Sequence, residues 1–226
     1  MSVSRRQFLR AGSGAALIAA TGCGPVPDVL KGLYPPARPQ ANGPFHPPSA
    51  EAIDPIAHAL SRLTFGARPG DYDRVRKLAK SEAAAAQAFV EEQLQPDRVD
   101  DAYTEYQVRN FESLAEPIGE LFEYKERYLL EEMTRATLLR AIRSERQLYE
   151  VMVQFWTDHF NIDSSKGDCR WLKAADDRDV IRAHALGKFP EMLRASALSP
   201  AMLWYLDGRV NRKASDADRP NENYAR

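Results

Sequence analysis

The sequence has 226 residues, of which 44% are hydrophobic and 28% charged, and its formal net charge at pH 7 is −1. This composition is typical of a globular protein that can bury one substantial core. Because the charge is close to balanced, the sequence does not indicate a nucleic-acid-binding protein, which normally carries an excess of basic residues. The two cysteines, Cys23 and Cys169, are too few for a disulfide scaffold.

Residues 1–23 predict an export signal. Arg5 and Arg6 stand in the sequence SRRQFL, which resembles the twin-arginine export motif, and the apolar run behind it is too short to span a bilayer permanently. Residues 20–23, ATGC, resemble a bacterial lipobox, in which the cysteine is lipidated, although Leu usually stands at its first position. We therefore expect export by the twin-arginine machinery and a lipid anchor at Cys23, with cleavage by an ordinary signal peptidase as the alternative.

Residues 24–50 are rich in proline. Proline fixes φ and removes a backbone donor, so this segment cannot form a regular helix or a central strand. We expect it to be an extended linker between the membrane and a domain at residues 51–226. That domain would then be periplasmic or exposed at the cell surface.

Residues 51–226 carry helix signals along their length. Asp54 followed by Pro55 is typical of a helix start, and Pro96 is typical of a helix end. No alternating apolar run lies between turn residues, as a strand would require. The helices predicted in chain order span residues 55–65, a stretch from 71, 81–94, 97–114, 117–143, 144–160, 176–186, 190–198 and 200–207. The predicted fold is all-α, a multi-helix bundle.

The helix predicted at 144–160 is the most apolar of the set. Ser144 and Gln147 have the spacing of a capping box. Two apolar stripes follow at helical spacing and leave only a narrow polar strip to face water. That strip consists of Glu150, Gln154, Thr157 and Asn161. We expect this helix to be buried at the centre of the bundle.

Polar and ionisable residues gather where this apolar run ends. His159 with Asp158 and Asp163 is a candidate for general acid–base chemistry, because imidazole titrates near neutral pH and carboxylates supply charge. His159 and Asp163 also have the i, i+4 spacing of paired metal ligands, although this pair alone specifies no metal. The alternative is that His159 is a buried histidine bonded to a carbonyl and that Asp163 caps a turn.

Two further residues are candidates for the same site. His184 lies on an apolar helical face, where a buried structural histidine is the alternative. Glu222 lies in the polar phrase PNENYAR, where it could supply a carboxylate to a pocket or cap a helix. The sequence identifies no cofactor and no metal.

Four segments of the chain resemble the sequences of a bacterial family of exported proteins known as domain of unknown function 1800. They lie at residues 58–71, 145–162, 181–207 and 220–226. The resemblance implies a helical exported protein of undetermined activity, often encoded beside a second exported protein that is a possible partner. In relatives the last segment continues into a longer helix, so we expect residues 51–226 to be the N-terminal portion of the usual domain.

Two functions are compatible with these features. The first is a lipid-anchored cell-envelope protein whose helical domain is a binding or scaffold module. The alternative is an exported enzyme that acts on a polymer or carries a metal or redox cofactor. Convergence of His159, His184 and a carboxylate in one cleft would favour the enzyme.

The lipid anchor can be tested by metabolic labelling with a radioactive fatty acid. The wild type should incorporate the label and Cys23→Ala should not, because the thiol of Cys23 is the acylated group. Equal labelling of the two proteins would contradict the anchor.

Overall fold

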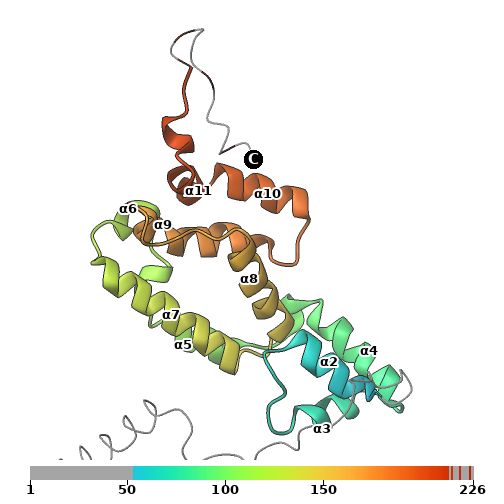
Figure 1. Ribbon diagram of the computed structural model, residues 1–226. Helices are drawn as coiled ribbons and strands as arrows, with labels where there is room; N and C mark the ends of the chain where they lie inside the picture. The colour runs from blue at the N-terminus through green and yellow to red at the C-terminus, as the bar shows by residue number, and fades with distance from the viewer. Residues whose placement is uncertain (1–52, 214, 216–218, 220–223, 225–226) are drawn as a thin grey trace, which may run out of the picture. The chain divides into compact units, whose positions relative to one another are not determined.

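A computed structural model describes residues 53–213, 215, 219 and 224, all within the compact unit Pro48–Arg226. In this part of the chain the secondary structure is helical and includes no strand, which confirms the all-α prediction (Figure 1). No helix of the described residues is both long and apolar enough to cross a membrane. The predicted signal segment at 1–23 and the linker at 24–50 lie outside the described residues.

The first three helices pack around a small core of their own. They are α2 Pro55–Leu63, α3 Asp71–Arg76 and α4 Glu82–Gln93. The carboxylate of Asp54 accepts hydrogen bonds from the backbone N–H groups of Ile56 and Ala57, at 2.8 and 3.1 Å, and so caps α2 as predicted. The largest buried side chains of this core are Ile56, Leu60, Val75 and Phe89.

The helices predicted at 97–114 and 117–143 are each interrupted. The elements found there are η3 Pro96–Arg98, α5 Ala102–Val108, η4 Glu112–Leu114, α6 Ile118–Leu121 and α7 Glu126–Arg143. Contacts with distant residues account for two of these features. Buried Glu132 accepts hydrogen bonds from the N–H and hydroxyl of Ser113, which holds η4, and the carbonyl of Tyr124 accepts from the indole of Trp171 between α6 and α7.

Helix α8, Gln147–His159, is joined to the end of α7 by a short turn at residues 144–146. The capping-box prediction is wrong, because the hydroxyl of Ser144 donates to buried Asp101, at 2.7 Å, and accepts from the N–H of Arg146. Glu145 N–H also donates to Asp101, at 3.0 Å. The carboxylate of Asp101 therefore accepts hydrogen bonds from the donors of this turn, and the predicted capping box does not form.

Two glutamines complete the contacts of this turn. Buried Gln93 of α4 accepts from Leu148 N–H at 3.1 Å and donates to the Glu145 carbonyl at 3.0 Å. The side chain of Gln147 accepts from Phe65 N–H and donates to the carbonyls of Ala141, in the last turn of α7, and Ser144. The α7–α8 turn is therefore bound to α4 and to the segments that follow α2 and precede α5.

Burial along α8 differs from the prediction. Its N-terminal half is buried, including Glu150, which was expected to face water. Its C-terminal end is not enclosed, because Phe155 is 52% exposed and both Asp158 and His159 are exposed. Only half of the helix is therefore a core element.

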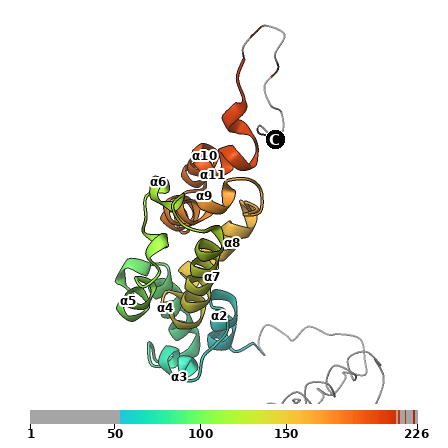
Figure 2. The same cartoon turned by 90° about the vertical axis from the view of Figure 1, so that its left-hand side faces the viewer.

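The helices that follow α8 in the described chain pack against α7, α8 and one another. They are α9 Cys169–Asp176, a π-helical segment η5 Asp177–Arg182, α10 Phe189–Leu198, α11 Pro200–Tyr205 and η6 Gly208–Val210. The helix predicted at 176–186 is therefore the continuation of one that starts earlier. Both views show α7 and α8 between α2–α4 on one side and α9–α11 on the other (Figures 1 and 2).

Replacing Gln93 should test how strongly α8 depends on α4. Gln93→Met keeps the length of the side chain but leaves the Leu148 N–H and the Glu145 carbonyl without their partner. We expect the free energy of unfolding to fall by about 2–4 kcal/mol in urea denaturation. Gln87→Met on the exposed face of α4 is the matched control and should change it by no more than about 0.5 kcal/mol. Equal effects would contradict this role of Gln93.

Candidate functional site

Five aromatic rings meet where α8 ends and α10 begins. We call this group, Phe155, Trp156, His159, Phe160 and Phe189, the aromatic cap. Its ring centroids lie between 4.8 and 6.4 Å from their neighbours. The indole N–H of Trp156 donates to the carbonyl of Ala185 at 3.0 Å, and the ring packs on the core below. The position of the cap is therefore fixed by the half-buried ring of Trp156.

The outer rings of the cap are open to solvent. Phe155 is 52% exposed, Phe189 is 48% exposed, and His159 is exposed as well. Large apolar side chains that gather on a surface are typical of contact sites. The cap is the first candidate functional site.

In the described part of the chain, no hydrogen bond or ion pair joins the side chain of His159 to Asp158 or Asp163, the two acids predicted to act with it. Asp158 accepts a hydrogen bond from Gln154, and Asp163 accepts one from Ser165 N–H at 2.8 Å. This backbone bond lowers the pKa of Asp163. Each acid therefore bonds within its own helix or turn, and the contacts of His159 are with aromatic rings.

The other predicted site residues are His184 and Glu222. His184 is half-buried, and its carbonyl accepts from Gly187 N–H in the turn that precedes α10. Glu222 lies outside the described residues. Within the described ranges, no group of three His, Cys, Asp or Glu side chains is placed to hold a metal ion.

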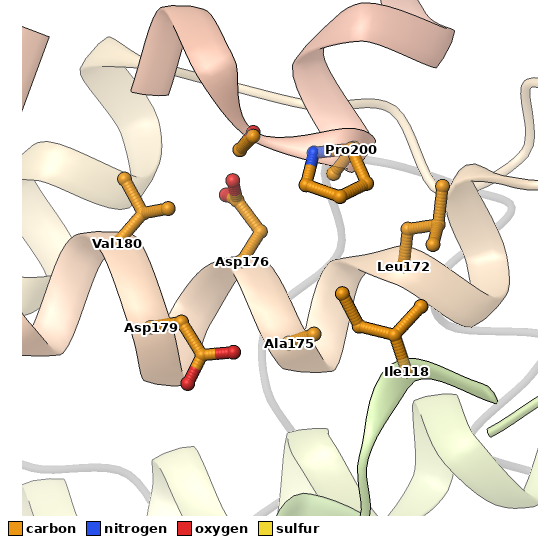
Figure 3. Close-up of a pocket in the computed structure, with 9 residues that line it drawn as sticks. Ile118, Leu172, Ala175, Asp176, Asp179, Val180 and Pro200 are labelled. Atoms are coloured by element: carbon orange, nitrogen blue, oxygen red, sulfur yellow. The ribbon is translucent and has the colours of Figure 1, made fainter. Parts of the chain in front are cut away.

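A second candidate site surrounds Asp176, at the end of α9. This residue is only 4% exposed, and its Oδ1 atom has no hydrogen-bond partner among the described residues. Its other interactions include a hydrogen bond with the side chain of Ser199. Figure 3 shows its carboxylate pointing from α9 toward Pro200, into a cavity of about 70 Å³, while Asp179 points the opposite way.

Burial raises the pKa of Asp176 to about 6, and the hydrogen bond with Ser199 and the charge of Lys173 only partly oppose this effect. Lys173 is itself buried, which lowers its own pKa. A buried carboxyl group that faces a cavity and has a raised pKa is a candidate for a functional site.

Directly after Asp176 the helix widens into the π-helical segment, which is held by a buried ion-pair network. The guanidinium of Arg182 donates two hydrogen bonds of 3.0 Å to the carboxylate of Glu150 and one of 2.8 Å to Asp177. Although burial alone would lower the pKa of Arg182, the charges of Asp177 and Glu150 raise it above its ordinary value. Local π-helical turns are frequent at functional sites.

Sequence reasoning missed Asp176, Ser199 and the Glu150–Arg182 pair as site residues. Asp176 and Ser199 stand at helix ends, where capping is the ordinary interpretation of both residue types. The five-residue spacing of Asp177 and Arg182 is the one available signal, since residues five apart are joined by backbone hydrogen bonds in a π-helix, whereas residues four apart are joined in an α-helix.

The raised pKa of Asp176 predicts a specific pH dependence of stability. Its pKa is about 6 in the folded protein and 3.8 ordinarily, so the folded state binds the proton more tightly. The favourable contribution is present below pH 4 and is lost as the pH rises through 6. At about 1.4 kcal/mol per pKa unit the loss is on the order of 3 kcal/mol.

Urea denaturation at pH 4.5 and pH 7 should therefore show a larger loss of stability in the wild type than in Asp176→Asn, which cannot ionise. Asp73→Asn on the exposed side of α3 is the matched control and should behave as the wild type. If Asp176→Asn loses as much stability as the wild type, the carboxyl does not titrate as described.

Comparison with known proteins adds the family to these observations. The family described as "Protein of unknown function (DUF1800)" matches residues 58–226, which contain both candidate sites. No curated protein and no solved structure matches the chain. The family match covers more than half of the chain and agrees with the resemblance found in its motifs, and we conclude that the chain belongs to the DUF1800 family.

Proposed function

We propose that this chain is an exported cell-envelope protein whose helical domain binds a partner protein through the aromatic cap. The observation that carries the proposal is the exposure of Phe155 and Phe189 above the anchored Trp156. Aromatic side chains, Phe among them, are enriched at protein–protein interfaces relative to the rest of the protein surface. An anchored indole keeps them in place before the partner arrives.

The arrangement of the rings favours a protein over a sugar. Phe155 and His159 are nearly parallel, at 11°, whereas Trp156 lies at 73° to Phe155 and 82° to His159. The surface is therefore stepped, and it offers no flat platform for a sugar ring. A stepped apolar surface suits interdigitating side chains, as at the packed centre of a protein interface.

The charges beside the cap favour a protein over a membrane. Asp158 and Glu191 are acidic, Lys188 is basic, and all three are exposed next to cap residues in the sequence. A mixed polar rim around an apolar centre is typical of protein interfaces. Binding to an anionic membrane would instead require an excess of basic residues.

The cellular setting is supported by the sequence. Arg5 and Arg6 match the twin-arginine motif, and Cys23 is the proposed site of the lipid anchor. The partner of first choice is the second exported protein that is often encoded beside members of this family. It would meet the domain in the same compartment.

Calorimetry with this chain and that second exported protein, both purified, tests the proposal. The double variant Phe155→Ala/Phe189→Ala should weaken binding at least tenfold, because two hot-spot rings are lost. Leu138→Ala/Ile142→Ala is the matched control, since both residues are large, apolar and exposed on α7, and it should bind as the wild type does. No binding by the wild type, or equal loss in both variants, would contradict the proposal.

A further inference from the structure

The cavity beside Asp176 is separate from the aromatic cap and has a composition suited to a small ligand. It is partly enclosed between α6, α9 and the start of α11. Most of its wall is apolar. The lining residues are Ile118, Leu172, Ala175, Asp176, Asp179, Val180, Ser199, Pro200 and Ala201.

The size of the cavity limits its occupant. An engineered apolar cavity of about 150 Å³ can bind benzene, which has six heavy atoms. The present volume of about 70 Å³ is roughly half of that, which corresponds to a ligand of three or four heavy atoms.

The polar groups of the cavity determine the chemistry of its occupant. The side chain of Ser199 accepts from Met202 N–H at 3.1 Å and is bonded to Asp176, so its one hydroxyl proton is already engaged within the protein. Oδ1 of Asp176 is a buried acceptor without a partner in the described chain. A buried acceptor of this kind is costly unless a donor satisfies it, and a cationic donor satisfies a carboxylate best.

We infer that this cavity binds the ammonium group of a short aliphatic amine. The ammonium donates to Oδ1 of Asp176, and the alkyl chain contacts Ile118, Leu172 and Ala175. The same chemistry is available from a free amine and from the end of a lysine side chain.

Binding is measured on the full chain at pH 8 by the rise in Tm with increasing ligand concentration. Propylammonium is compared with propanol, which has the same size without the charge. The wild type should bind propylammonium at least tenfold more tightly than propanol, and Asp176→Asn should reduce that preference to about twofold or less. Equal binding of the two ligands by the wild type, or a preference that survives in Asp176→Asn, would overturn the inference.

Ala175→Val provides a test that leaves the carboxylate in place. The side chain of Ala175 lies between Ile118 and Asp176 (Figure 3), so two added methyl groups should fill the site and weaken propylammonium binding at least fivefold. Binding unchanged in this variant would place the amine elsewhere and overturn the assignment.

Nα-acetyl-lysine methylamide distinguishes the two sources of the ammonium group. If it binds in an Asp176-dependent manner as well as propylammonium does, the site accepts a lysine side chain. If propylammonium alone binds, the site takes a free amine. Both of these results support the inference. If neither of the two ligands binds, the inference is overturned.

Discussion

The structure depends on satisfying the buried polar groups of the α7–α8 turn. Backbone groups that leave water without a partner cost several kcal/mol, so a sharp buried turn is stable only if side chains replace the lost water. Gln93 and Asp101 do this from two other segments, and Gln147 does it from within the turn while it also binds Phe65 N–H. These contacts determine where α8 begins and therefore where both candidate sites lie.

One turn further along, Glu150 connects α8 to the C-terminal helices. Its forked pair with Arg182, completed by Asp177, is almost fully buried. A buried ion pair contributes little net stability compared with apolar packing, but loss of one partner is strongly destabilising. The contribution of this network is to position the helices, because the π-helical turn directly after Asp176 brings Asp177 and Arg182 together. The same network that anchors α8 thus supports the helix that carries the unpaired carboxyl.

The sequence predicted the helical class and the capped start of α2, because periodicity and capping are local properties. It did not predict the breaks at Ser113 and Tyr124, because Glu132 and Trp171, which hold them, are distant in the sequence. The sequence predicted that Glu150 faces solvent. The pattern of a single helix does not show that Arg182, from another helical segment, pairs with this carboxylate and allows it to be buried. The sequence identified the end of α8 as a candidate site region, but for the acids and imidazole there and not for the aromatic cap, to which α10 contributes Phe189. Asp176 could not be recognised, because its importance lies in the cavity and not in its neighbours along the chain.

Helix α8 joins the helices on its two sides into one cooperative unit. All three tryptophans, Trp156, Trp171 and Trp204, lie in the second half of the chain, whereas circular dichroism reports on every helix. Urea unfolding followed by both signals tests the claim directly, since a single cooperative unit gives coincident transitions. We expect the two curves to coincide for the wild type. A tryptophan transition clearly separated from the loss of helix would show that the two groups of helices unfold independently and would contradict the claim.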